Sequence, residues 1–168
     1  PASALKRLDF EVSVDTLYIR NSNFTYREYV EPALEPGRIW FTDINLEGRN
    51  IVNSDSLIAM NSRMMFTGGG KLMGEGNIST TVRFELDSPE DAFSATGVVN
   101  PMNITELNPL LEHVAFVKVR KGYNNMLRFN FNADDSLSRG GMNFKYEKLK
   151  IRLIDKKNLR DDGFGESI

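Results

Sequence analysis

Hydrophobic and polar residues alternate along much of this chain. Two segments show the pattern at Leu8–Asp15 and Val82–Asp87, and a third shows it most clearly at Leu127–Asp134. In the third segment Leu127, Phe129, Phe131 and Ala133 take the odd positions, and Arg128, Asn130, Asn132 and Asp134 take the even ones. Because successive side chains of a strand point to opposite faces, each segment predicts a strand with one apolar and one polar face.

The rest of the chain continues the pattern with short interruptions. Further strands are expected at Phe24–Val30, Gly37–Glu47, Leu57–Thr67, Gly70–Met73, Phe93–Val99, Val114–Lys121 and Met142–Leu153. Turn-forming residues separate them at 21–23, 35–37, 88–91 and 134–136. Connections this short predict antiparallel pairing, because parallel crossovers need about a dozen residues or more.

The apolar phase slips by one residue within three of these strands. The slips fall near Asp15–Thr16, Thr42–Asp43 and Glu147–Lys148. A regular strand keeps its parity, so each slip predicts a β-bulge or a bend, and bulges curve a sheet. The alternative interpretation is that a covering loop buries both faces of these strands.

One segment, near residues 103–112, predicts helix. Asn103 is a candidate cap with Glu106 three residues later, and apolar residues follow at helical spacing. Pro109 interrupts the segment, so one or two short turns are expected. The fold class predicted is therefore all-β: a curved antiparallel sheet, either a taco-like open half-barrel or a sandwich, with one short helical segment. Residues 1–154 form a single domain in this interpretation, and 155–168 are a charged linker or disordered tail.

The amino-acid composition argues against several kinds of binding site and catalytic site. The chain has 21 basic and 23 acidic residues, which gives no electrostatic reason to expect a nucleic-acid partner. It has no cysteine and one histidine, so thiolate metal sites and Ser-His-Asp catalysis are not expected. No enzyme activity and no cofactor are predicted.

Individual motifs favour structural interpretations. Gly68–Lys71 lacks the spacing of a phosphate-binding loop and is interpreted as a glycine-rich turn between strands. The pairs Asp134–Asp135 and Asp161–Asp162 are interpreted as turn-forming residues and not as a cation site. His113, beside an apolar run, is interpreted as a structural residue. Trp40 lies on the face opposite its apolar neighbours and could be exposed, which leaves a carbohydrate-active enzyme or a carbohydrate-binding domain as a further alternative. The seven methionines suit either a variable apolar surface or a core.

The order of motifs in the second half resembles a known family. The motifs are residues 96–102, 107–112, 117–122, 127–134 and 140–149, preceded by a strand pair at 14–26. They resemble the C-terminal part of AsmA-like proteins, particularly the large ones of Bacteroidota-type bacteria. The family is similar to the repeating β-groove proteins that handle lipids between membranes.

The resemblance implies a non-enzymatic segment of a periplasmic body, anchored in the inner membrane by a part outside this chain. It implies roles in lipid handling or envelope maintenance, with lipid acyl chains, the rest of the same polypeptide and envelope proteins as partners. The residues expected to line a lipid groove are Val82, Phe84, Leu86, Leu127, Phe129, Phe131, Met142 and Phe144. The pattern fits a closed core of the same residues equally well. A passive protein-interaction or scaffolding module of the envelope is the alternative function.

Overall fold

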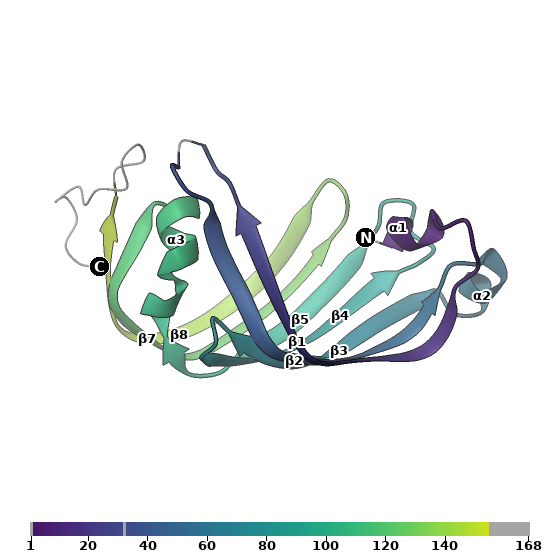
Figure 1. The fold of residues 1–168 in the computed structure, drawn as a ribbon, viewed down its shortest axis with the longest axis horizontal. Coiled ribbons are helices and arrows are strands. Elements are labelled where there is room, and N and C mark those ends of the chain that lie inside the picture. The colour runs from purple at the N-terminus through teal and green to yellow at the C-terminus, as the bar shows by residue number, and fades with distance from the viewer. Residues whose placement is uncertain (1, 32, 155–168) are drawn as a thin grey trace.

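The computed structural model describes residues 2–31 and 33–154, and these form one open, curved antiparallel sheet. The predicted tail at 155–168 lies outside the described residues. The strands run in the order β1-β2-β3-β4-β5-β7, with β8 on the far side of β7 and the short β6 also paired to β7. Their bounds are β1 Ser13–Glu28, β2 Gly37–Val52, β3 Arg63–Leu72, β4 Gly76–Glu85, β5 Phe93–Val99, β6 Met102–Asn103, β7 Val117–Ala133 and β8 Ser138–Leu153. Figure 1 shows a trough, with short helices at both ends.

Two long strands replace four shorter predicted ones. Residues 21–23 were expected to form a turn, but β1 runs through them with a shift in register, and Asn21 has a φ of 48°. β7 likewise joins Val114–Lys121 to Leu127–Asp134. Asn124 lies between these segments, 3% exposed, and its side-chain amide donates to the carbonyls of Val99 and Asn100. Polar residues therefore continue a strand where a bulge or a side-chain hydrogen bond satisfies the backbone.

The predicted bulges are confirmed at two of three places. Asp43 has a φ of 52° at a register shift between β2 and β3, and Lys148 has a φ of 51° where the β7–β8 register shifts. The bulge predicted at Asp15–Thr16 is absent, because the β1–β2 register shows no shift there. Asn50 of β2, between the partners of Val14 and Thr16, has a left-handed φ of 57°.

The glycine run lies inside a strand and not in a turn, which corrects the prediction. Gly68 and Gly69 occupy the middle of β3. A Cβ on Gly68 would lie 2.1 Å from the carbonyl oxygen of Asn45, and one on Gly69 would lie 2.1 Å from that of Ile78. The neighbouring strands approach so closely that only glycine fits.

Two predicted strands begin later than expected. The predicted strand at Leu57–Thr67 starts instead with the helix α2, Asp55–Met60, and β3 begins only at Arg63. The predicted strand at Leu8–Asp15 starts at Ser13, after the helix α1, Ala2–Lys6, and a loop. Short apolar runs fit either a strand or a helix, and at α2 tertiary packing selects helix, whereas residues 8–12 form a loop.

The predicted helical segment near 103–112 is confirmed as two turns. The 3-10 helix η1, Ile104–Leu107, is capped by the Asn103 side chain, which accepts from the N–H of Thr105 at 3.1 Å. The α-helix α3, Asn108–Val114, follows with Pro109 in its first turn. The Asn108 side chain accepts from the N–H of Val119 at 2.8 Å and donates to its carbonyl at 2.9 Å, as a neighbouring strand would.

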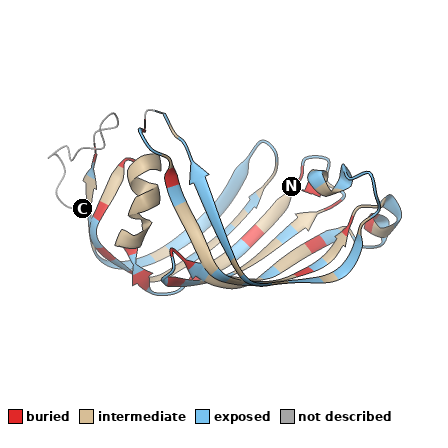
Figure 2. Cartoon of the chain, in the orientation of Figure 1, coloured by how far each residue is buried: buried red, intermediate tan, exposed pale blue. Residues whose placement is uncertain are grey.

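Buried residues gather at the two ends of the trough. At one end α1 and α2 pack on a cluster of Ala2, Val52, Ile58, Met64 and Leu86. At the other end η1 covers a cluster of Leu72, Met73, Val99 and Met102. Trp40 packs against this second cluster and is half-buried, so it is not the exposed residue that its position in the pattern suggested. Figure 2 shows few buried residues along the strands between these ends.

Candidate functional site

The strand register gathers apolar side chains on the concave face. Val82 lies opposite Ala95, which lies opposite Phe131, and Phe84 lies opposite Phe93. Directly paired residues of antiparallel strands project to the same face, so these side chains form one continuous surface. We call the concave surface between the two end clusters the trough and define it by Val82, Phe93, Ala95, Phe129 and Phe131.

A row of phenylalanines crosses the strands on this face. Ring centroids are 6.3 Å apart for Phe66 and Phe84, 5.6 Å for Phe84 and Phe93, and 5.9 Å for Phe93 and Phe131. Phe129 continues the row, 6.3 Å from Phe131. The pairs alternate between edge-on and stacked arrangements, which are the geometries that aromatic rings prefer. The row runs from β3 to β7 and gives the trough its lining.

Glycines face two of these rings. A Cβ on Gly97 would lie 2.4 Å from Cζ of Phe129, and a Cβ on Gly48 would lie 2.6 Å from Cε1 of Phe66. Each ring therefore lies across the backbone of the glycine opposite it, where any side chain would displace it. The glycines keep the rings low, so the trough stays hollow.

The residues predicted to line a groove mostly share this face. Val82, Phe84, Leu127, Phe129, Phe131, Met142 and Phe144 lie on it by register. Leu86 does not contribute exposed surface: it is 0% exposed in the end cluster under α1 and α2. Met142 is 67% exposed on the edge strand β8 and forms part of the rim.

Sequence reasoning missed two members of the phenylalanine row. Phe66 and Phe93 both lie in predicted strands. Phe66 shares a strand face with Met64, and Phe93 shares one with Ala95. Alternation showed that each strand has an apolar face. Only the cross-strand register shows that these faces meet, so the signal needed was pairing between strands.

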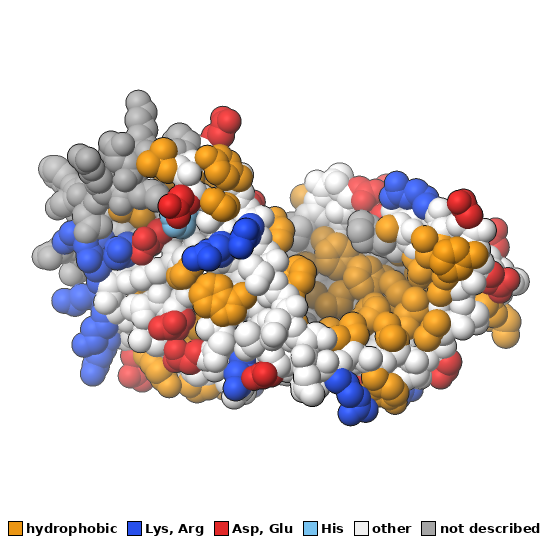
Figure 3. Space-filling view, in the orientation of Figure 1, with side chains coloured by type: hydrophobic (Ala, Val, Ile, Leu, Met, Phe, Trp, Pro, Cys, Tyr) orange, Lys and Arg blue, Asp and Glu red, His pale blue; other side chains and the backbone are white. Residues whose placement is uncertain are grey.

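The middle of the trough has no second layer over it within residues 2–31 and 33–154. Phe93, Phe129 and Phe131 are each half-buried, although each has aromatic neighbours in the sheet. In a sandwich the opposite sheet would bury them fully. Figure 3 shows hydrophobic side chains lining a hollow in this part of the molecule. The described residues therefore form an open groove and not a closed core.

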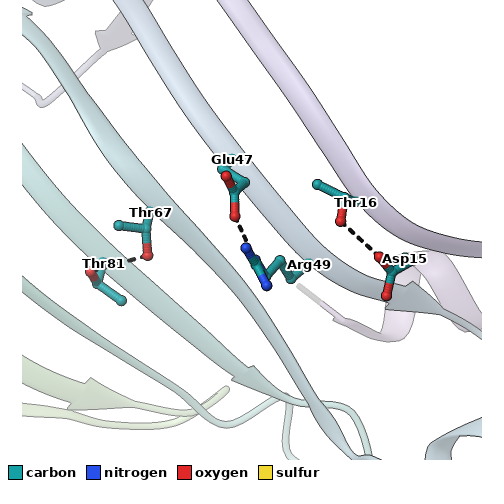
Figure 4. Close-up of polar contacts among 6 residues, drawn as sticks. All are labelled: Asp15, Thr16, Glu47, Arg49, Thr67 and Thr81. Carbon is teal, nitrogen blue, oxygen red and sulfur yellow. Dashed lines mark hydrogen bonds and ion pairs between the residues drawn. The ribbon is translucent and has the colours of Figure 1, made fainter.

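The convex face is polar. Thr67 and Thr81 lie side by side across β3 and β4 with their hydroxyl oxygens 3.3 Å apart, and Glu47 forms an ion pair with Arg49 on β2 (Figure 4). Thr16 donates to Asp15 on β1, in the same view. Water solvates this face, so the two faces of the sheet differ sharply in polarity.

The polar groups that the sequence singled out have structural contacts. Lys71, after the glycine run, forms an ion pair with Asp43 at 3.0 Å. Asp134 accepts from the N–H groups of Ser136 and Leu137 and from the Ser136 hydroxyl, and these hydrogen bonds lower its pKa. His113 is the exception: it lies half-buried in α3, and its buried Nδ1 atom has no hydrogen-bond partner among the described residues. Across the described residues, no group of three or more metal-ligating side chains comes together.

Comparison with known proteins identifies no relative of this chain. No protein-family model, no curated protein and no solved structure matches the chain. Among the described residues, no helix has the length and apolar character that crossing a bilayer requires. The apolar trough is the feature of the molecule on which a functional argument can rest.

Proposed function

We propose that this chain is a non-enzymatic segment of an AsmA-like periplasmic protein, anchored in the inner membrane elsewhere, that handles lipids by taking acyl chains into the trough. The observation that carries the proposal is the row of half-buried phenylalanines on a concave, single-layered sheet. A soluble protein keeps such a surface when something apolar covers it in use. The motif order of residues 96–149 supports the AsmA-like assignment.

An acyl chain suits the trough energetically. Each methylene transferred from water to apolar surroundings gains about 0.8 kcal/mol, so ten methylenes gain about 8 kcal/mol before the costs of association. The clusters under α1–α2 and under η1 close the trough at both ends. The lipid headgroup therefore stays at the open side, in water, while the chain lies on the rings.

A scaffolding role is the second candidate. In the described part of the chain, β1 and β8 each have one strand partner, so each leaves one edge of its backbone unpaired. Exposed edges pair readily with further strands, from the same polypeptide or from an envelope protein. The two functions differ in which surface is used: the trough for lipid, the edges for protein.

Photocrosslinking on adjacent residues tests the lipid proposal. A benzophenone amino acid replaces Phe129 on the concave face or, as the matched control, the next residue Asn130, whose side chain alternates to the convex face of the same strand. Both variants are illuminated in bacterial cells that export the chain to the periplasm, and adducts are identified by mass spectrometry. We expect phospholipid or other acyl-chain adducts at position 129 and none at position 130.

Equal lipid labelling at the two positions, or none at position 129, would count against the proposal. Protein adducts from β1 or β8 with no lipid adduct at position 129 would favour the scaffolding role. Native mass spectrometry of gently purified protein gives an independent reading, because a bound lipid adds its mass to the folded chain.

A further inference from the structure

Positive charge gathers at one end of the β7–β8 hairpin. The basic side chains are Lys118, Arg120, Lys121, Lys145, Lys148, Lys150 and Arg152, and within residues 117–125 and 143–153 the one acidic residue is Glu147. The whole chain has a net charge of −2, so this end departs from the rest of the molecule. Figure 3 shows Lys and Arg side chains at the end of the molecule where Figure 1 places β7 and β8.

The register places like charges opposite one another. Lys121 pairs with Lys150 across β7 and β8, and Lys118 pairs with Arg152. Like charges directly opposite in a sheet are destabilising. Elsewhere the sheet places Arg63 opposite Glu85, and the two form an ion pair at 3.6 Å.

Lys121 and Lys150 differ from Lys118 in their ion pairing with the described residues. Lys118 forms an ion pair with Glu112 at 3.1 Å, while Lys121 and Lys150 form none with any described residue. Glu147 accepts a hydrogen bond from the Asn125 side chain at 2.9 Å. A third like-charge pair, Arg27 opposite Arg38, lies between β1 and β2. It has acidic residues close by in the sequence, namely Glu28, Glu31 and Glu35.

An exposed tyrosine lies among these cations. Tyr123 is 46% exposed and lines a pocket of about 340 Å³ with Arg120, Lys121, Lys148 and Glu147. Tyrosine beside lysine suits the boundary between lipid headgroups and water, where both the ring and the charge are satisfied.

We propose that this basic end of β7 and β8 docks on the surface of an anionic lipid bilayer. Phosphate groups of the bilayer supply the negative charge that the Lys121–Lys150 pair lacks within the described chain. The inference stands independently of acyl-chain binding, because it concerns the convex, charged end of the hairpin and not the phenylalanine row. The two can therefore fail separately.

Vesicle binding by a double variant tests the docking surface. K121Q/K150Q removes the like-charge pair, and R63Q/R83Q makes the same change in net charge on β3 and β4. Flotation measures binding to vesicles of phosphatidylglycerol and phosphatidylcholine and to vesicles of phosphatidylcholine alone. Each lysine near an anionic surface is worth about fivefold in partitioning, so K121Q/K150Q is expected to bind the anionic vesicles about 25-fold more weakly. R63Q/R83Q is expected to bind within about twofold of the unchanged protein.

Thermal unfolding of the same variants separates docking from folding. Because like charges repel, K121Q/K150Q is expected to unfold at the same or a higher temperature while its vesicle binding falls. The conservative variant K121R/K150R is expected to retain binding, and 1 M salt to abolish it, since the screening length there is about 3 Å.

Three results would overturn the proposal: equal binding to both kinds of vesicle, equal loss in the two glutamine variants, or a fall in unfolding temperature that accounts for the lost binding. Binding to a single-stranded oligonucleotide as tight as to anionic vesicles would also overturn it, because the surface would then recognise polyanions in general. Lipid adducts at position 129 report on the trough alone and do not bear on these outcomes.

Discussion

Individual glycines shape the lining of the trough. At Gly97 and Gly48 a phenylalanine ring of the neighbouring strand occupies the space that a Cβ atom would need. Glycine in a strand normally weakens it by about 0.5–1 kcal/mol relative to alanine. The sequence accepts that cost where a ring must lie close to the sheet, so the absence of a side chain has a direct structural effect here.

Gly97→Ala is expected to destabilise the protein by about 1–3 kcal/mol, the range for overpacking a filled site. The new Cβ would lie 2.4 Å from the Phe129 ring and 2.8 Å from the Ser79 carbonyl oxygen, and the backbone atom cannot move as a flexible side chain would. Chemical denaturation measures the change. Gly141→Ala on β8 is the control, because its nearest neighbour would be 3.8 Å away. An equal loss of unfolding free energy in Gly97→Ala and Gly141→Ala would contradict the conclusion that the Phe129 ring leaves no room for a side chain at position 97.

At the scale of elements, a carboxylate holds α1 on the sheet. Asp91, in the connection between β4 and β5, is buried and accepts from the backbone N–H of Ser3 at 2.6 Å. Hydrogen bonds from Ser3 lower the pKa of Asp91 below its usual 3.8, against the opposing effect of burial. The first turn of α1 thus receives its cap from a residue far along the chain. This contact helps the helix close one end of the trough.

Acid is expected to loosen α1 through Asp91. Because the folded-state pKa is lowered, the contribution is complete above pH of about 3.8 and is lost as the pH falls through the folded value. Asp91→Ala removes it at every pH and is expected to cost about 1 kcal/mol, a typical capping value. Hydrogen exchange of residues 2–6 measures the release of the helix. Asp135→Ala, in an exposed turn, is the control. Unchanged exchange in Asp91→Ala would show that apolar packing alone holds α1.

At the scale of the whole molecule, the sheet is a single curved layer with two small capped ends. Two buried clusters lie under α1–α2 and under η1, and a third, of Ala33, Phe116 and Ile154, lies where β7 begins and β8 ends. The middle of the concave face has no cover among the described residues. A single layer buries less apolar surface than a sandwich of the same length. The protein is therefore expected to gain stability when an apolar ligand fills the trough.

Removal of lipid tests this expectation. The delipidated protein is expected to unfold at a lower temperature than protein carrying lipid. Palmitate at about 100 times its dissociation constant is expected to restore about 2.7 kcal/mol. For a chain of this size that corresponds to a rise of about 5–10 °C in the unfolding midpoint by calorimetry. Butyrate serves as the control, because its short chain buries few methylenes. A midpoint that palmitate leaves unchanged would argue against an acyl-chain site.

Much of the architecture could be predicted from local pattern. Alternation identified the strands at Phe93–Val99 and Leu127–Asp134, and the phase slips located the bulges at Asp43 and Lys148. These succeed because side-chain parity is a property of a strand by itself. Pattern failed at the glycine run, where the reason for glycine is the closeness of neighbouring strands. It failed also at α2, where the apolar run fits either structure and packing on the end cluster decides.

Amphipathic antiparallel strands, with bulges at Asp43 and Lys148, follow from the amino-acid sequence alone, because period-two alternation and its slips are local. The tertiary structure alone decided which apolar faces meet. It brought Phe66 and Phe93 into one row with Phe129 and Phe131, buried Leu86 beneath α1 and α2, and set Lys121 opposite Lys150. The physical reason is that these relations depend on cross-strand register and on the curvature of the whole sheet, which no single strand contains.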